Sequence, residues 1–272
     1  MKKLLSNKGS NLKCLKNFSQ VARPSYVHGT SDHSLIYLTI GQLLNRTTHK
    51  YPSNLAVHVQ HQKITKTYSE LYADVQKVAA AFVSLNLQPK DRIGIYSPNN
   101  YEWLVTQLAA AAADLILVNI NPAYQSEELK YTLNKVKCKA LVMASTHKKS
   151  NYIEILSKIA PEIKEEGAKR HKLKLKELPN LKTLISLDNE VRGSFYNFQD
   201  LYDMHDSKDI IELDKRAAKM NPDDPTNIQF TSGTTGFPKG ATLSHINIVN
   251  NGFFVGQTIN YSPEDRVCIP VP

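Results

Sequence analysis

The sequence predicts an α/β protein with largely parallel sheets that are covered by helices. Three observations support this prediction. Strand-like apolar runs alternate with helix-like patterns, and such alternation indicates right-handed crossovers between parallel strands. The 272 residues are 41% hydrophobic, which suffices to bury a sizeable core in one or two domains. A loop rich in glycine and hydroxyl side chains lies between an apolar run and a helical pattern, as phosphate-binding loops do.

The first predicted elements are a strand over residues 55–59, a short turn at His61 and Gln62, and a long helix. Thr67 and Glu70 have the spacing of a capping box, in which each side chain binds the other residue's backbone N–H. The apolar positions of this helix share one face: Leu71, Val75, Val78, Ala79, Phe82 and Leu85.

Further strands and helices alternate along the middle of the chain. A helix with apolar residues at helical spacing precedes the strand at 115–118, and Ser126 is expected to cap the next helix. Another helix is expected around 153–159. The remaining predicted strands cover residues 92–96, 140–143, 183–187, 228–230 and 266–271. This order predicts helices on both faces of the sheet.

Segment 162–182 interrupts the alternation with a run of lysines. Such a run usually forms a solvated loop or helix end, and we expect a surface excursion before the next strand. Binding to phosphate or nucleic acid is the alternative. The absence of interleaved aromatic residues that could stack on bases disfavours it.

The formal charge of +9 is concentrated near the N-terminus, where six lysine and arginine residues precede the first acidic residue, Asp32. Together with serines and leucines, this composition predicts a mitochondrial presequence over residues 1–30 and a location in the matrix. A disordered basic tail is the alternative. Because the rest of the chain is only mildly basic, we expect no nucleic-acid partner.

Membrane and metal-binding classes are not indicated. The apolar stretch 103–120 contains Gln107 and Asp114 and is better explained as a helix followed by a buried strand, so we expect no transmembrane segment. The cysteines are widely spaced, odd in number and without a CxxC pattern, which argues against a zinc site or a disulfide framework: Cys14, Cys138 and Cys268.

The stretch 231–239 has the composition of a phosphate-binding loop. Its two glycines allow several backbone N–H groups to point at one anion, and its hydroxyls and ammonium group add donors. It differs from a Walker A loop because Lys239 stands between Pro238 and Gly240. The candidate binding residues are Thr231, Ser232, Gly233, Thr234, Thr235, Gly236, Phe237, Pro238 and Lys239. The simpler alternative is a polar surface turn.

Residues 230–245 resemble the phosphate-loop signature of the adenylate-forming enzymes, a family of acyl-CoA synthetases, luciferases and peptide-synthetase adenylation domains. Upstream segments resemble the mitochondrial medium-chain acyl-CoA ligases of this family: 25–29, 97–99, 101–103, 121–125 and 227–251. The resemblance implies that residues 31–272 are the N-terminal part of an AMP-binding domain, truncated after the phosphate loop, and that the C-terminal domain is absent. Asp114 stands where the family usually has glycine, and aspartate tolerates the left-handed conformation of such a turn.

The resemblance also implies a reaction. A fatty acid attacks the α-phosphate of ATP to form acyl-AMP, and the thiol of coenzyme A then displaces AMP. On this basis the loop backbone and hydroxyls hold the phosphates with Mg²⁺, Lys239 is the catalytic cation, and Phe237 and Pro238 shape the turn. The expected partners are small molecules, namely fatty acid, ATP and CoA. The alternatives are a catalytically silent nucleotide-binding fragment and a basic interaction protein; the oligomeric state is not predicted.

Two further sites have competing explanations. His245 could act as a general base, but its place in the first turn of a helix that Ser244 would cap favours a structural role. Asp223 and Asp224 precede a proline and are expected to form a turn that leads into the strand before the loop.

Overall fold

A computed structural model describes residues 29, 31–165, 170, 173–188, 193–231 and 238–270. Two units can be distinguished, residues 1–35 and 36–272, and every helix and strand below belongs to the second. The helices are α1 (Ile40–Lys50), α2 (Tyr68–Ser84), α3 (Tyr101–Ala112), α4 (Ser126–Lys135), α5 (Tyr152–Ile159), α6 (Ser207–Lys219) and α7 (His245–Thr258). Short 3-10 helices are η1 (Gln60–Gln62), η2 (Pro161–Lys164) and η3 (Gln199–Tyr202).

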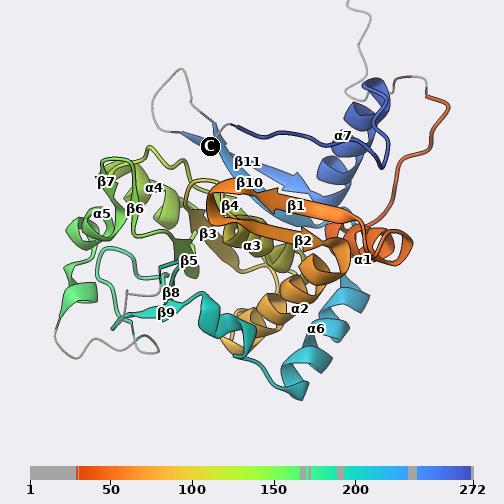
Figure 1. Ribbon diagram of the computed structural model, residues 1–272. Coiled ribbons are helices and arrows are strands. Elements are labelled where there is room, and N and C mark those ends of the chain that lie inside the picture. The colour runs from red at the N-terminus through yellow and green to blue at the C-terminus, as the bar shows by residue number, and fades with distance from the viewer. Residues whose placement is uncertain are drawn as a thin grey trace, which may run out of the picture. The chain divides into compact units, whose positions relative to one another are not determined.

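The strands form one large sheet and two small hairpins (Figure 1). In the large sheet the order is β11 (Lys239–Ser244), β10 (Pro225–Thr231), β4 (Ile116–Asn119), β3 (Arg92–Tyr96), β5 (Ala140–Met143), β8 (Thr183–Ser186) and β9 (Phe195–Asn197). All neighbours are parallel except β10 and β11. The hairpins are β1 (Leu55–Val59) with β2 (Ile64–Thr67) and β6 (Thr146–His147) with β7 (Ser150–Asn151). The predicted α/β class is confirmed.

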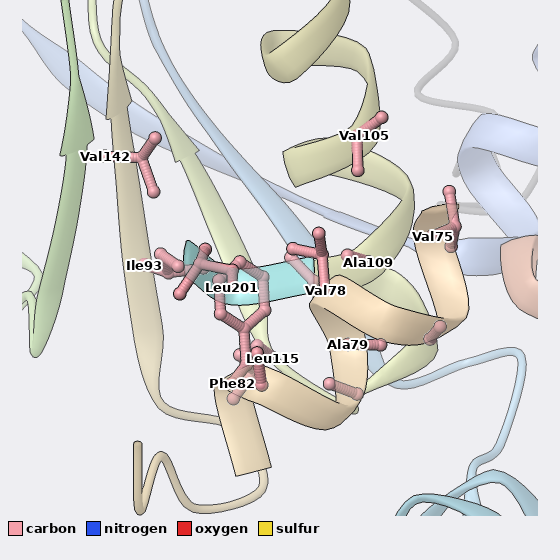
Figure 2. Packing of buried hydrophobic residues seen from close by; sticks show 14 of the residues in the cluster. Val75, Val78, Ala79, Phe82, Ile93, Val105, Ala109, Leu115, Val142 and Leu201 are labelled. Atoms are coloured by element: carbon pink, nitrogen blue, oxygen red, sulfur yellow. The ribbon is translucent and has the colours of Figure 1, made fainter. Parts of the chain in front are cut away.

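Helices cover both faces of the sheet because successive strand residues point in opposite directions. In β5, Ala140 and Val142 join the apolar cluster that includes α2 and α3, whereas Leu141 and Met143 join the cluster that includes α4 and α5. Figure 2 shows the first cluster, in which Phe82 of α2 packs with other fully buried side chains. The sequence prediction of helices on both faces is therefore correct.

The capping box of α2 forms as predicted. The Thr67 hydroxyl accepts the Glu70 N–H at 3.3 Å, and the Glu70 carboxylate accepts the Thr67 N–H at 2.7 Å. The prediction for α4 was one residue off, because Gln125 is the cap and its N–H donates to the Glu128 carboxylate. Ser126 is the first helical residue, and its hydroxyl donates instead to the Ile155 carbonyl of α5.

The turn at Asp114 adopts the expected left-handed conformation, with φ of 61°. Its carbonyl accepts the Lys90 N–H at 2.6 Å, and its carboxylate pairs with the Lys90 ammonium. Residues 103–120 contain most of α3, the turn at Asp114 and β4, and no helix in the described part of the chain is long and apolar enough to span a bilayer.

Other elements differ from the sequence prediction. Helices α1 and α6 and strands β2, β9 and β11 were not predicted, since they are short or largely polar. The strand predicted at 266–271 was wrong for residues 266–270, which have no regular structure and expose Val267 and Ile269. No strand in the described residues pairs with this segment, and a strand needs such a partner for its backbone hydrogen bonds. Val271 lies outside the described residues.

The basic segment is more than a surface excursion. Lys174 and Lys176 are exposed as expected, but the neighbouring leucines are buried against the α4 and α5 side of the sheet: Leu173, Leu175, Leu178 and Leu181. The alternation of lysine and leucine therefore places one side of the segment in the core. The charge run concealed this apolar pattern in the sequence.

Candidate functional site

The candidate phosphate loop connects the antiparallel strands β10 and β11. Thr231 and Lys239 are register partners at the base of the loop, and the Thr231 hydroxyl donates to the Lys239 carbonyl at 3.4 Å. The predicted residues Ser232, Gly233, Thr234, Thr235, Gly236 and Phe237 lie outside the described residues. The sequence predicted that the loop leads directly into a helix. In the structure β11 lies between the loop and α7, so the loop is the turn of a hairpin.

Polar residues of the hairpin share one face of the sheet. Because side chains alternate along a strand, Asn227, Gln229 and Thr231 of β10 point to the same side. The register adds Lys239 opposite Thr231 and Asn119 of β4 beside Gln229. The side-chain N–H of Asn227 donates to the side-chain amide oxygen of Asn119 at 2.7 Å. A row of polar groups thus leads from the buried part of the sheet to the loop.

The opposite face of the hairpin is apolar and closely packed. A Cβ atom at Gly240 would lie 3.2 Å from Cγ2 of Ile228 and 3.5 Å from the Phe230 ring. A larger residue at this position would need the Ile228 side chain to shift by a few tenths of an ångström. The glycine after Lys239 therefore suits the close packing on this face of the hairpin.

The ammonium group of Lys239 is available for an anion. The side chain is exposed, and within the described ranges no carboxylate lies at ion-pair distance from it. It also stands at the carboxyl end of β10, the edge at which open α/β sheets bind ligands. These residues fit a nucleotide phosphate, with the hydroxyl of Thr231 as a further donor beside the lysine.

Two stacked tyrosines hold the neighbouring loop at the carboxyl end of β4. The rings of Tyr96 and Tyr152 have centroids 3.9 Å apart. The Tyr96 hydroxyl donates to the Tyr124 carbonyl at 2.6 Å, and the Tyr152 hydroxyl donates to the Pro122 carbonyl at 2.8 Å. Burial raises the pKa of Tyr152 to about 12, so its hydroxyl remains a proton donor at neutral pH.

The stacked pair of Tyr96 and Tyr152 and the hydrogen bond between Asn119 and Asn227 were not predicted from the sequence. The sequence signal for both pairs was a polar or amphipathic residue at the end of an apolar run. Only the parallel register brings Asn119 beside β10.

His245 has a structural role and lies away from the loop. The Ser244 hydroxyl caps α7 as predicted, accepting the Asn247 N–H at 3.3 Å. The His245 ring is 1% exposed, and its Nδ1 accepts the Ile40 N–H at 3.2 Å. Burial, and secondarily the charge of Lys90, lowers the pKa of His245 to about 4, so the ring is neutral at pH 7.

Asp223 and Asp224 belong to a turn before β10, as expected. The Asp224 N–H donates to the Asn221 carbonyl at 2.9 Å, and the Asp224 carboxylate pairs with Lys90 at 2.9 Å. This turn lies at the amino end of β10, so these carboxylates stand at the edge of the sheet opposite the loop. No group of three or more histidine, cysteine or acidic residues suited to a metal ion occurs in the part of the chain that the structure describes.

Comparison with known proteins relates the chain to an enzyme family. Residues 44–272 match the sequence model of the AMP-binding enzymes. Over 250 residues the chain is 44% identical to "Medium-chain acyl-CoA ligase ACSF2, mitochondrial" of Danio rerio, and over 252 residues it is 40% identical to the Homo sapiens protein of the same name. Both matches cover 91% of this chain and 41% of the relative. The chain thus spans about two-fifths of the length of these curated relatives.

A solved structure supports the fold. The long-chain-fatty-acid-CoA ligase FadD1 from Archaeoglobus fulgidus superimposes with a TM-score of 0.67 at 19% identity. The superposition covers 89% of this chain and 43% of that protein. At this level of identity the likeness shows a shared α/β architecture.

Proposed function

Because the chain belongs to the family of AMP-binding enzymes, we propose that it is the N-terminal part of an ATP-dependent fatty acid–CoA ligase. The observation that carries the proposal is the hairpin, which places Lys239 and Thr231 together at the carboxyl edge of the sheet. The names of the relatives suggest medium-chain fatty acids as the substrate.

The proposed reaction activates a carboxylate. The fatty carboxylate attacks the α-phosphorus of ATP and expels pyrophosphate, which gives a mixed anhydride, acyl-AMP. The thiol of coenzyme A then attacks the acyl carbon, loses its proton and expels AMP. The protein contributes chiefly by orienting the reactants and by stabilising the charge on phosphate.

Each residue of the loop has a proposed role in this reaction. Lys239 would place its ammonium against the β- and γ-phosphates, as Thr231 would its hydroxyl. Backbone N–H groups of residues 233–236 and the hydroxyls of Ser232, Thr234 and Thr235 would surround the same oxygens, and Phe237 and Pro238 would shape the turn. Mg²⁺, when bound with ATP, offsets the phosphate charge.

Fatty-acid-dependent exchange of labelled pyrophosphate into ATP tests this proposal. The assay should use the protein at its natural length, with octanoate and then fatty acids of other lengths. Lys239→Ala is expected to slow exchange by about 10²–10³-fold, the usual cost of losing one preorganised charge-stabilising donor. Lys219→Ala, an exposed lysine on α6, is the matched control and should exchange at the wild-type rate.

The outcomes separate the competing functions. Exchange by Lys239→Ala at the wild-type rate would refute the role of this lysine. Binding of MgATP without any exchange would favour a catalytically silent nucleotide-binding fragment. Absence of both would favour the basic interaction protein.

We also propose that the protein is targeted to the mitochondrial matrix. The support is the acid-free basic composition of residues 1–30 and the mitochondrial names of the relatives. Residues 1–28 and 30 lie outside the described residues. A fluorescent protein fused behind residues 1–30 should enter mitochondria, and diffuse cytosolic fluorescence would contradict the proposal.

A further inference from the structure

Six lysines with no role in the proposed reaction come from neighbouring segments beside α4. We call this set the basic strip: Lys135, Lys137, Lys139, Lys174, Lys176 and Lys182. They come from the end of α4, the turn before β5, the basic segment 162–182 and the position directly before β8. All are exposed except Lys139, which is partly exposed.

Hydrogen bonds show that these segments are neighbours. The N–H of Lys182 donates to the Lys139 carbonyl at 2.8 Å. On the other side of α4, the Asn134 side chain donates to the Glu177 carbonyl at 2.9 Å, and Lys130 pairs with the Glu177 carboxylate at 2.6 Å. Residues 174–177 therefore lie against α4. The chain continues from the end of α4 to Lys139, which is hydrogen-bonded to Lys182.

The strip follows the α4 side of the sheet and the amino ends of β5 and β8. Lys139 and Lys182 directly precede the register partners Ala140 and Thr183, so they lie side by side where these two strands begin. Lys174 and Lys176 alternate with leucines buried in the cluster on this side, so their ammonium groups point outward from it. In Figure 1 this is the side of the sheet that carries α4 and α5.

Among the described residues, none of the six ammonium groups of the strip has a carboxylate at ion-pair distance. The nearby Glu177 carboxylate is paired with Lys130, and the Glu162 carboxylate accepts the N–H of Lys176. Clustered positive charge of this kind is attracted to a surface with a high density of negative charge.

We propose that the basic strip binds the surface of an anionic lipid bilayer. Lysines act as point charges toward many phosphates, which suits a diffuse lipid surface. Binding to bases is less favoured because the neighbouring Arg92 uses its guanidinium on the carbonyls of Lys90, Val136 and Lys137. Because the leucines that alternate with Lys174 and Lys176 are buried, attachment is electrostatic, without insertion of side chains into the bilayer.

Co-sedimentation of the full chain with vesicles tests the proposal. One vesicle is phosphatidylcholine alone, and the other is an equimolar mixture of phosphatidylcholine and phosphatidylglycerol. Each lysine near an anionic surface contributes roughly fivefold to partitioning, so K135Q/K174Q/K182Q should reduce binding to the mixed vesicle on the order of 100-fold. Binding should also fall between about 0.1 M and about 1 M salt, as the Debye length shrinks from about 10 to about 3 Å.

Two triple variants serve as controls. K208Q/K215Q/K219Q removes three exposed lysines from α6, on the other side of the sheet, and should bind as the wild type does. K135R/K174R/K182R keeps the charge and should also retain binding. Circular dichroism checks that each variant is folded.

Three results would overturn the proposal. The first is equal binding of the wild type and K135Q/K174Q/K182Q, whether binding is absent or is carried by the basic N-terminal residues. The second is equal binding to neutral and mixed vesicles. The third is loss of affinity for a labelled oligonucleotide in K135Q/K174Q/K182Q while vesicle binding is unchanged, which would assign the strip to nucleic acid.

Discussion

Replacing Arg216 by alanine should weaken the attachment of α6 to the sheet domain. This arginine is 5% exposed although it is charged. Its Nη1 donates to the Leu87 carbonyl at 2.9 Å and to the Ala113 carbonyl at 3.3 Å, and its Nε donates to the Glu212 carboxylate at 3.1 Å. The two carbonyls follow the C-terminal ends of α2 and α3, where helix dipoles favour a cation.

The size of the effect follows from these contacts. A hydrogen bond from a charged donor contributes about 1.5–3 kcal/mol, and Arg216→Ala removes two such bonds to buried carbonyls. The Glu212 side chain is 43% exposed, so its pairing adds little. We expect Arg216→Ala to lower the free energy of unfolding by about 3–4 kcal/mol. This is less than the full contribution of the hydrogen bonds, because burying the guanidinium charge in the wild type is itself unfavourable. Arg216→Lys should recover part of this loss, because lysine keeps the charge but lacks the planar fork.

Urea denaturation followed by circular dichroism measures this loss. With a slope of about 3 kcal/mol per M, the midpoint for Arg216→Ala should fall by about 1 M. The matched control is Lys215→Ala, an exposed neighbour on the same helix, whose change should stay within about 0.5 kcal/mol. Equal midpoints for the two variants would refute the reasoning.

Two further changes test the core and the buried histidine. Gly94→Ala should cost about 1–3 kcal/mol in urea denaturation, because the new Cβ would lie 3.0 Å from both Ile120 Cδ1 and Leu141 Cδ1; no loss would show that these side chains can move. The pKa of His245 is about 4 in the folded state and 6.5 when unfolded, so its contribution to stability is complete above pH 6.5 and is lost as pH falls toward 4. The wild type should therefore lose about 2 kcal/mol more than His245→Gln between pH 7 and pH 5, and parallel losses would contradict the assignment.

Much of the fold could be predicted from sequence because its central elements have strong local signals. The strand at 92–96 is an apolar run between turn residues, and the helix that begins after Thr67 has both a capping box and one apolar face. The glycine and hydroxyl composition around Lys239 likewise indicates an anion site from the sequence alone. These signals are local, since each depends on residues a few positions apart.

The tertiary structure decided what depends on partners distant in sequence. The polar segment 239–244 becomes a strand only because β10 pairs with it, whereas the apolar segment 266–270 has no such partner among the described residues and forms no strand. Lysines from four segments become one basic strip only when β5, β8 and α4 are brought together. Period and composition determine what a segment can form. Backbone pairing and burial, which join residues far apart along the chain, determine which of those possibilities is realised.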